Sequence, residues 1–183
     1  MIKTDNYGIV FNKLKSNILD DWQQYTKHTF VKCIGNASLD RKLYIKYLKQ
    51  DYIFLIHFSR AWALLVAKSN SVNEMRIASA TLNALVNEEI QLHIKTCKAE
   101  GISEEQLFNT LEDVNNLAYT RFVLEAGYSG DFLDLLVALS PCVFGYGEIG
   151  LYLKSISKND NPYISWIDTY HSKEYQDVCI NIG

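Results

Sequence analysis

Proline is scarce in this sequence of 183 residues, where only Pro141 and Pro162 occur. Sustained alternation of polar and apolar residues, which is typical of strands, is also lacking. Long windows instead place apolar side chains every three to four residues, the period of an amphipathic helix. The sequence therefore predicts an all-α protein, a compact bundle of about six to eight helices that forms a single domain over residues 1–183.

A basic surface is lacking as well. The 18 lysines and arginines are scattered and the net charge is -3. The sequence therefore predicts no basic face that could bind a phosphate backbone, and we expect no nucleic-acid partner. The N-terminus has no apolar core followed by a small-residue cleavage site, and apolar runs such as Ala61–Ala67 are too short to cross a bilayer. We therefore expect a soluble, cytoplasmic protein with no membrane partner.

Closely spaced cysteines are absent too. The four cysteines lie far apart without a Cys-x-x-Cys pair, which favours reduced thiols over disulfides or a zinc site. They are Cys33, Cys97, Cys142 and Cys179.

The apolar period and the capping residues predict where the helices lie. The first is expected over about residues 11–27, with its apolar stripe at Phe11, Leu14, Ile18, Trp22 and Tyr25, and the second over about 41–68. Capping boxes at Ser71 with Glu74 and at Ser103 with Gln106 open two more, the former ending at Gly101. A helix over about 113–126 should end at Gly127, Ser129 or Asp131 should cap the next one, and Asn161 followed by Pro162 should open a short helix.

The stretch from Leu139 to Gly150, LSPCVFGYGEIG, places Cys142 directly after Pro141 in a helical pattern. We expect Pro141 to kink or break the helix beside the thiol, and the three glycines that follow to allow close approach of another backbone or a ligand. The segment is either a site or an ordinary kinked core helix with a small buried cysteine. One helical face should hold Leu135, Ala138, Leu139, Cys142, Tyr146, Ile149 and Leu153.

Asp51 interrupts an apolar and aromatic stripe formed by Tyr44, Tyr47, Leu48, Phe54 and Leu55. An unpaired buried carboxylate costs several kcal/mol, so Asp51 needs a partner or a proton. That partner is an arginine or a tyrosine hydroxyl if the role is structural, and a cationic or amino-bearing ligand if it is functional.

Glu89 and His93 are spaced i and i+4, and we expect them to form a hydrogen-bonded pair. A diiron site would need Glu-x-x-His on two helices, which this chain lacks, so no metal is expected. His57 is interpreted as a satisfied core histidine rather than a haem ligand. The hydroxyls of Tyr119, Tyr146 and Tyr170, meeting Asp51 at one cavity, would suit a flat ring with a polar edge, on which Phe54 could stack.

Four segments of the chain resemble the TenA/thiaminase II family. They are Tyr47–Trp62, the NEEIQLH stretch that ends at His93, the run from Ala118 through LSPCVFGYGEIG, and NPYISWIDTY at Asn161–Tyr170. The resemblance implies a haem-oxygenase-like helical bundle, usually a homotetramer and free of cofactors. Such proteins hydrolyse 4-amino-5-aminomethyl-2-methylpyrimidine, left by thiamin breakdown, to the hydroxymethyl pyrimidine and ammonia, and some also cleave thiamin.

The resemblance also implies roles for single residues. Cys142 matches the catalytic cysteine, which adds to the pyrimidine ring, and Asp51 matches the aspartate that holds the ring nitrogen and its exocyclic amine. Catalysis is assigned to Cys142, Tyr119 and Tyr146, and substrate binding to Asp51, Phe54, Tyr119, Tyr146, Tyr170 and Glu89.

The family normally continues into further C-terminal helices, one of which carries an acid-base glutamate, whereas this chain stops at Gly183. Glu89, Glu148 or Tyr119 is therefore expected to serve as the acid-base group in its place. If none does, the chain is expected to bind a pyrimidine or thiamin with weak or no catalysis. A weaker third alternative is a redox or regulatory protein in which Cys142 senses oxidants.

Overall fold

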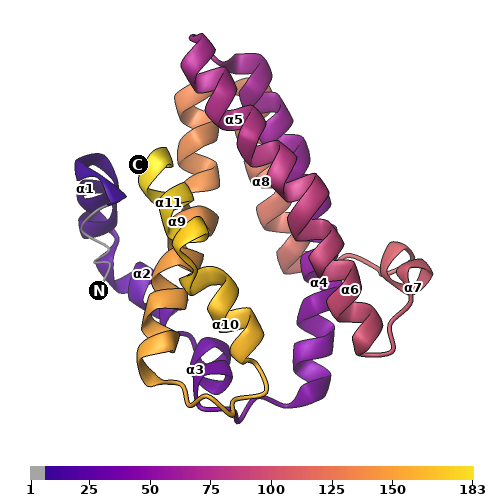
Figure 1. Ribbon diagram of the computed structural model, residues 1–183. Helices are drawn as coiled ribbons and strands as arrows, with labels where there is room; N and C mark the ends of the chain where they lie inside the picture. The colour runs from indigo at the N-terminus through magenta and orange to yellow at the C-terminus, as the bar shows by residue number, and fades with distance from the viewer. Residues whose placement is uncertain (1–6) are drawn as a thin grey trace. The chain divides into compact units, whose positions relative to one another are not determined.

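The computed structural model describes residues 7–183, which form helices joined by short turns and contain no strand (Figure 1). Residues 1–6, where the segment examined for a secretory signal begins, lie outside the described part. The all-α prediction is confirmed. The described chain divides into two compact units, residues 40–139 and residues 7–39 with 140–183, and the single domain stays a prediction.

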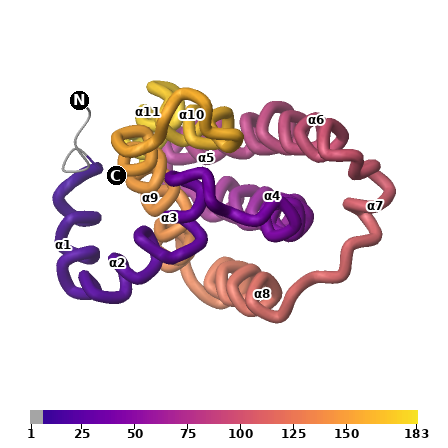
Figure 2. The backbone as a smooth tube through the Cα atoms, turned by 90° about the horizontal axis from the view of Figure 1, so that it is seen from below, coloured from indigo at the N-terminus to yellow at the C-terminus, as the bar shows by residue number. Residues whose placement is uncertain are grey.

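Helix α4, Arg41–Lys68, is the longest element and has the bounds that the sequence predicts. It begins where the Asp40 carboxylate accepts a hydrogen bond from the backbone N–H of Lys42, at 2.7 Å. Within its unit, α4 lies between α8, Val114–Ser129, on one side and α5, Val72–Ala84, with α6, Ile90–Ala99, on the other (Figure 2). Its buried side chains include Leu48, Leu55, Trp62 and Leu65.

The predicted capping boxes are confirmed. The backbone N–H of Glu74 donates to the Ser71 hydroxyl at the start of α5, while the Glu74 carboxylate accepts from the Ser71 N–H. Ser103 and Gln106 form the same reciprocal pair at the start of α7, Glu104–Phe108. Helix α8 does not end at Gly127 as expected but continues to Ser129, and that glycine lies close against the Leu64 side chain.

The predicted helix that starts at Ser71 contains a π-helical segment, η2, at Leu85–Glu89. A π-helix has a wider turn than an α-helix, so it shifts the face that later residues present. Val86, which lies within this segment, is 42% exposed. The helix still ends as expected, at Gly101 with its positive φ of 78°.

The predicted helix over residues 11–27 is two helices in the other unit, α1, Ile9–Asn17, and α2, Leu19–Thr26. Asp20 and Asp21 stand in the first turn of α2, where carboxylates stabilise a helix N-terminus. Phe11 and Trp22 remain buried and meet edge to face at 5.5 Å. Helices α3, Thr29–Gly35, and α11, Lys173–Ile182, were not predicted, so the described residues form more than eight helices.

Helix α9, Phe132–Ile156, continues through Pro141, so the expected break is absent. Asp131 caps it by accepting from the backbone N–H groups of Leu133 and Asp134. By length and composition this helix could cross a membrane, and the prediction that every apolar segment is too short was wrong here. Half of its most apolar stretch is buried inside the protein.

Asn161 joins the start of α10, Ile164–His171, to α3. Its side-chain oxygen accepts from the backbone N–H of Tyr163 at 2.8 Å, and its amide donates to the carbonyls of Ile34 and Gly35. Residues 162 and 163 form a turn, so the helix begins at Ile164, two residues later than the Asn-Pro pair predicts.

The glycines of α9 lie where neighbouring groups approach the helix closely, as predicted. A β-carbon at Gly150 would overlap the backbone of Tyr170 and lie 2.7 Å from the backbone nitrogen of His171, and one at Gly147 would lie 2.6 Å from the Tyr7 hydroxyl oxygen. Backbone atoms cannot turn aside as a side chain can, so Gly150 is the more constrained position.

Gly150→Ala should therefore lower the free energy of unfolding by about 1 to 3 kcal/mol, the usual cost of overpacking, although alanine is the better helix former. Gly127→Ala is the matched control, because only leucine side chains face that glycine and they can adjust. Urea unfolding followed by circular dichroism measures both variants. Equal stabilities would contradict the assigned backbone contact.

Candidate functional site

The Asp51 carboxyl lies on α4 and is 8% exposed. The Tyr47 hydroxyl donates to its Oδ2 atom at 3.2 Å, and the Nδ1 atom of His93 lies 3.6 Å from the same oxygen. Burial raises the pKa of Asp51 to about 7, and the hydrogen bond from Tyr47 opposes this. The predicted buried carboxylate is confirmed, with a tyrosine hydroxyl as its partner.

His93 is held between two groups of α4. Its Nε2 atom lies 2.6 Å from the carbonyl oxygen of Leu48, and its ring stacks on Tyr52 with 6.5 Å between centroids. Burial lowers the pKa of His93, and the hydrogen bond to Leu48 opposes this. The predicted Glu89–His93 pair is wrong, because both ring nitrogens of His93 face groups of α4 instead.

Glu89 itself remains a candidate. Burial raises its pKa to about 7, and the negative charge of Asp51 contributes in the same direction. Two carboxyl groups with raised pKa values therefore lie on neighbouring elements, one on α4 and one at the end of η2. Such pairs are typical of functional sites, although structural networks produce them too.

Phe54 and Tyr119 are also brought together within residues 40–139. Their rings stack with 6.0 Å between centroids and an interplanar angle of 9°, and Phe58 also stacks on Phe54. The Tyr119 hydroxyl donates to the carbonyl of Ala138 at 3.2 Å. This contact ties α8 to the part of α9 that precedes Pro141.

The predicted face of α9 is confirmed by its burial. Of its seven residues, five are buried, and only Cys142 and Tyr146 keep partial access to solvent. The thiol and the phenol are thus the accessible members of an otherwise interior face. Cys97 and Cys179, by contrast, are fully buried, and burial raises their pKa values to about 11 and about 12.

Tyr146 and Tyr170 meet within their unit, with 4.6 Å between ring centroids. Trp166 contacts both rings, at 5.9 and 4.7 Å, and was missed by the sequence analysis. The sequence feature that could have identified Trp166 is its i, i+4 spacing to Tyr170 on α10. The sharing of one cavity by the three tyrosines and Asp51 stays a prediction.

Glu148, expected as a possible acid or base, is engaged elsewhere. Its carboxylate pairs with Lys15 and accepts a hydrogen bond from the Trp22 indole at 2.8 Å. Glu148 lies six positions after Cys142, so it points about 240° around the helix axis from the thiol. Glu148 therefore anchors α1 and α2 to α9, and its part in acid-base catalysis stays a prediction.

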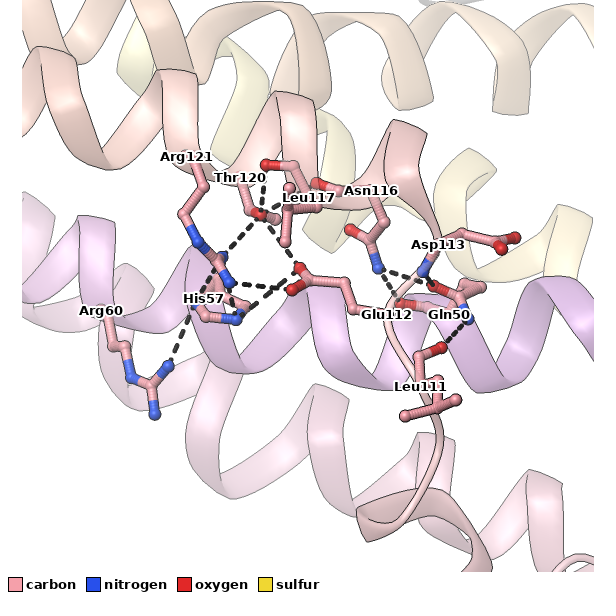
Figure 3. A network of polar contacts seen from close by, with 10 residues as sticks. All are labelled: Gln50, His57, Arg60, Leu111, Glu112, Asp113, Asn116, Leu117, Thr120 and Arg121. Carbon is pink, nitrogen blue, oxygen red and sulfur yellow. Dashed lines mark hydrogen bonds and ion pairs between the residues drawn. The ribbon is translucent and has the colours of Figure 1, made fainter.

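His57 belongs to a polar network between α4 and α8 (Figure 3). Its Nδ1 atom lies 3.1 Å from the Arg60 guanidinium, its Nε2 atom 3.2 Å from that of Arg121, and Glu112 pairs with Arg121 at 2.8 Å. Burial, and secondly the charge of Arg121, lower the pKa of His57. The ring lies in a half-buried polar network rather than in the core that the sequence predicts. The described residues hold no group of three or more potential metal ligands.

Comparisons with known proteins agree on one family. A model of the TENA/THI-4/PQQC family matches residues 16–181. An uncharacterized protein of Haemophilus influenzae is 42% identical over 86% of this chain and 74% of its own length, and an aminopyrimidine aminohydrolase of Halalkalibacterium halodurans is 38% identical over 86% and 71%. The crystal structure of a TenA-family transcription regulator from a Silicibacter species matches with a TM-score of 0.96 at 53% identity, over 98% of this chain and 80% of that one.

The raised pKa of Asp51 makes stability depend on pH. Between the ordinary value of 3.8 and about 7 the folded protein holds a proton at Asp51 that the unfolded chain has released, so stability falls as the pH rises through this window. An amide cannot ionise, so Asp51→Asn should gain stability relative to the wild type by roughly 1 to 3 kcal/mol more at pH 8 than at pH 5. Urea unfolding at both pH values tests this.

The exposed Asp160 supplies the control, since Asp160→Asn removes the same charge at a solvated position. Its difference from the wild type measures the effect of removing a carboxylate that is exposed to solvent in the folded protein. An Asp51→Asn difference that is independent of pH would show that Asp51 ionises in the folded protein as it does in water.

Proposed function

Because the chain belongs to the TENA/THI-4/PQQC family, we propose that it hydrolyses the aminomethyl pyrimidine left by thiamin breakdown to the hydroxymethyl pyrimidine and ammonia. The 38% identity to an aminopyrimidine aminohydrolase over most of the chain supports this choice of substrate. Thiamin is the second substrate to test, because it contains the same aminopyrimidine ring.

The observation that carries the proposal is the buried carboxyl of Asp51. An aminopyrimidine presents a ring nitrogen beside an exocyclic amine, and a carboxyl group matches this edge with one oxygen for each. Burial strengthens such hydrogen bonds, because water does not compete for them. Asp51 is therefore the proposed substrate anchor, and Glu89 is proposed as a second acidic group in substrate binding.

Cys142 is the proposed nucleophile. Its sulfur bonds to a ring carbon of the pyrimidine, and the thiol proton leaves with the amine as ammonia, so that the exocyclic carbon–nitrogen bond breaks. Water then adds to the exocyclic carbon, its second proton returns to the sulfur, and the carbon–sulfur bond breaks. The net reaction consumes one water and releases one ammonia.

The aromatic residues are proposed to position the ring and the protons. Phe54 and Tyr119, already stacked on each other, are assigned to the flat face of a pyrimidine. Tyr146 and Tyr170 contact each other near the accessible part of the α9 face and are assigned to its polar edge. Tyr119 and Tyr146 also serve in proton transfer in this proposal.

We further propose that the protein acts in the cytoplasm as a homotetramer that needs no cofactor. Several large apolar side chains of residues 108–137 are more than half exposed in the single chain, which supports burial against another copy. They are Phe108, Leu111, Val114, Phe122, Leu133 and Val137.

Cys142→Ser should keep the fold and abolish ammonia release, because a hydroxyl is a far weaker nucleophile than a thiol without an activating base. Release of the hydroxymethyl pyrimidine from the aminomethyl pyrimidine, and from thiamin, is the measurement. Cys33→Ser is the matched control, since Cys33 is another half-buried thiol and lies on α3. Undiminished turnover by Cys142→Ser would remove the thiol from the mechanism.

A wild-type protein that releases no ammonia, yet is stabilised against heat by the hydroxymethyl pyrimidine, would instead be a pyrimidine-binding protein. Oxidant-dependent change at Cys142 without any effect of the pyrimidine would indicate a redox role.

Asp51→Ala should weaken binding of the hydroxymethyl pyrimidine by about 1 to 3 kcal/mol, because it removes both oxygens that are proposed to face the ring nitrogen and the exocyclic amine. Isothermal titration calorimetry gives the dissociation constant. An unchanged constant in the folded variant would assign Asp51 a purely structural role.

A further inference from the structure

We propose that two amide side chains, Asn116 and Gln50, are positioning residues for the candidate site. They hold the Tyr119 ring against Phe54 and so preform the surface on which the flat face of the pyrimidine stacks. The inference rests on the proposed function, in which this aromatic pair binds the ligand. All four residues lie in the unit of residues 40–139, and the argument is built on the hydrogen bonds between α4 and the start of α8.

Gln50 joins α4 to the segment that leads into α8 (Figure 3). Its Nε2 atom donates to the carbonyl oxygen of Leu111 at 2.9 Å, and its Oε1 atom accepts from the backbone N–H of Asp113, also at 2.9 Å. A carbonyl only accepts and an N–H only donates, so these two backbone groups determine which way the Gln50 amide points. The Asp113 carboxylate pairs with Lys46 and does not cap α8, so the hydrogen bond from Gln50 is what holds this helix start to α4.

Asn116, in the first turn of α8, makes two hydrogen bonds to the same residue of α4. Its Nδ2 atom donates to the backbone carbonyl oxygen of Gln50 at 2.8 Å and to the Oε1 atom of the Gln50 side chain at 3.2 Å. Both hydrogens of one amide group are therefore used on one residue. In an α-helix this backbone carbonyl also accepts from the N–H of residue 54, so Asn116 is bound to the turn of α4 that carries Phe54.

These hydrogen bonds fix the register of the two helices at the aromatic pair. The contact of Asn116 with Gln50 is followed, one turn later on both helices, by the stack of Tyr119 on Phe54. A slide of α8 by one residue would move Tyr119 about 1.5 Å along α4 and would break both hydrogen bonds of Asn116. Later contacts between the same helices continue in the same order, His57 with Arg121 and Leu64 with Gly127.

The Tyr119 side chain is thereby held at both ends. Its hydroxyl donates to the carbonyl of Ala138 at 3.2 Å, and its backbone lies three residues after Asn116. With both ends held, the ring lies within 9° of parallel to Phe54. Apolar contacts between α4 and α8 are non-directional and do not select one register, whereas these hydrogen bonds do. Rings that are ordered before the ligand arrives lower the entropic cost of binding it.

Two matched pairs of variants test the Asn116 contact. Asn116→Asp keeps the shape of the side chain but turns an acceptor oxygen toward the two oxygens of Gln50. Asn115→Asp is its control, because this exposed neighbour lies in the same turn, where a carboxylate stabilises the helix start in the same way. Asn116→Ala, with Asn115→Ala as its control, is the milder pair. It should fold, because the N–H of Asp113 still satisfies the Oε1 atom of Gln50.

The first measurement needs no ligand and is independent of the proposed function. In protein with carbon-13 tyrosine, Tyr119→Phe identifies the Tyr119 ring signals, and Phe54→Leu identifies the part of their chemical shift that comes from the stacked ring. Both Asn116 variants should move these signals toward their position in Phe54→Leu, whereas both Asn115 variants should leave them in place. Tyr119 signals that keep their wild-type position in the folded Asn116 variants would overturn the proposal.

The second measurement relates the contact to the ligand, by titration calorimetry with the hydroxymethyl pyrimidine. Asn116→Asp should bind about three- to tenfold more weakly than the wild type, the affinity that corresponds to one aromatic stacking contact. In protein that already carries Phe54→Leu it should cause little further loss, because the ring that it holds Tyr119 against is gone. An unchanged affinity, or an equal loss with and without Phe54, would overturn the positioning role.

The two measurements separate this inference from the proposed function. A wild-type protein that does not bind the pyrimidine, together with Tyr119 signals displaced in both Asn116 variants, would support the placement of Tyr119 and count against the proposed function alone.

Discussion

Removal of the Asp51 carboxyl from water is the constraint around which helices α4, η2 and α6 are arranged. The Tyr47 hydroxyl donates to this carboxyl, His93 lies 3.6 Å from it, and His93 is held in turn by the Leu48 carbonyl. All these contacts lie within two turns of α4. The register between α4 and α6 therefore follows from polar groups as well as from apolar packing, because a shift of one residue would separate His93 from the Leu48 carbonyl.

The helix that carries Cys142 is held by a different kind of constraint, namely close approach. Buried Gln176 accepts from the Tyr7 hydroxyl and donates to the carbonyls of Gly147 and Tyr170, so one side chain joins the N-terminal segment, α9, α10 and α11. Alanine would not fit at Gly147 or Gly150 without displacing these groups. The thiol thus lies on a rigid helix rather than on a loop, which suits a group that must meet its target in one geometry.

Much of the fold and part of the candidate site could be predicted from residue patterns. The bounds of α4, both capping boxes, the buried α9 face and the burial of Asp51 depend on local rules that act within one or two turns. The break at Ile18, helix α11 and the partner of His93 depend on contacts distant in sequence. The pairing of Glu89 with His93 failed because both ring nitrogens of His93 face groups of α4, which helical counting along one segment cannot reveal.

The π-helical turn also bears on how this chain should be aligned with its relatives. A π turn accommodates one residue more than an α turn, and such turns can arise when a single residue is inserted into an ancestral helix. A relative that lacks this residue would form an unbroken α-helix. Its residues on either side of this point would face the same directions as here, with one residue fewer between them. The gap in such an alignment belongs inside Leu85–Glu89, not in the loops on either side.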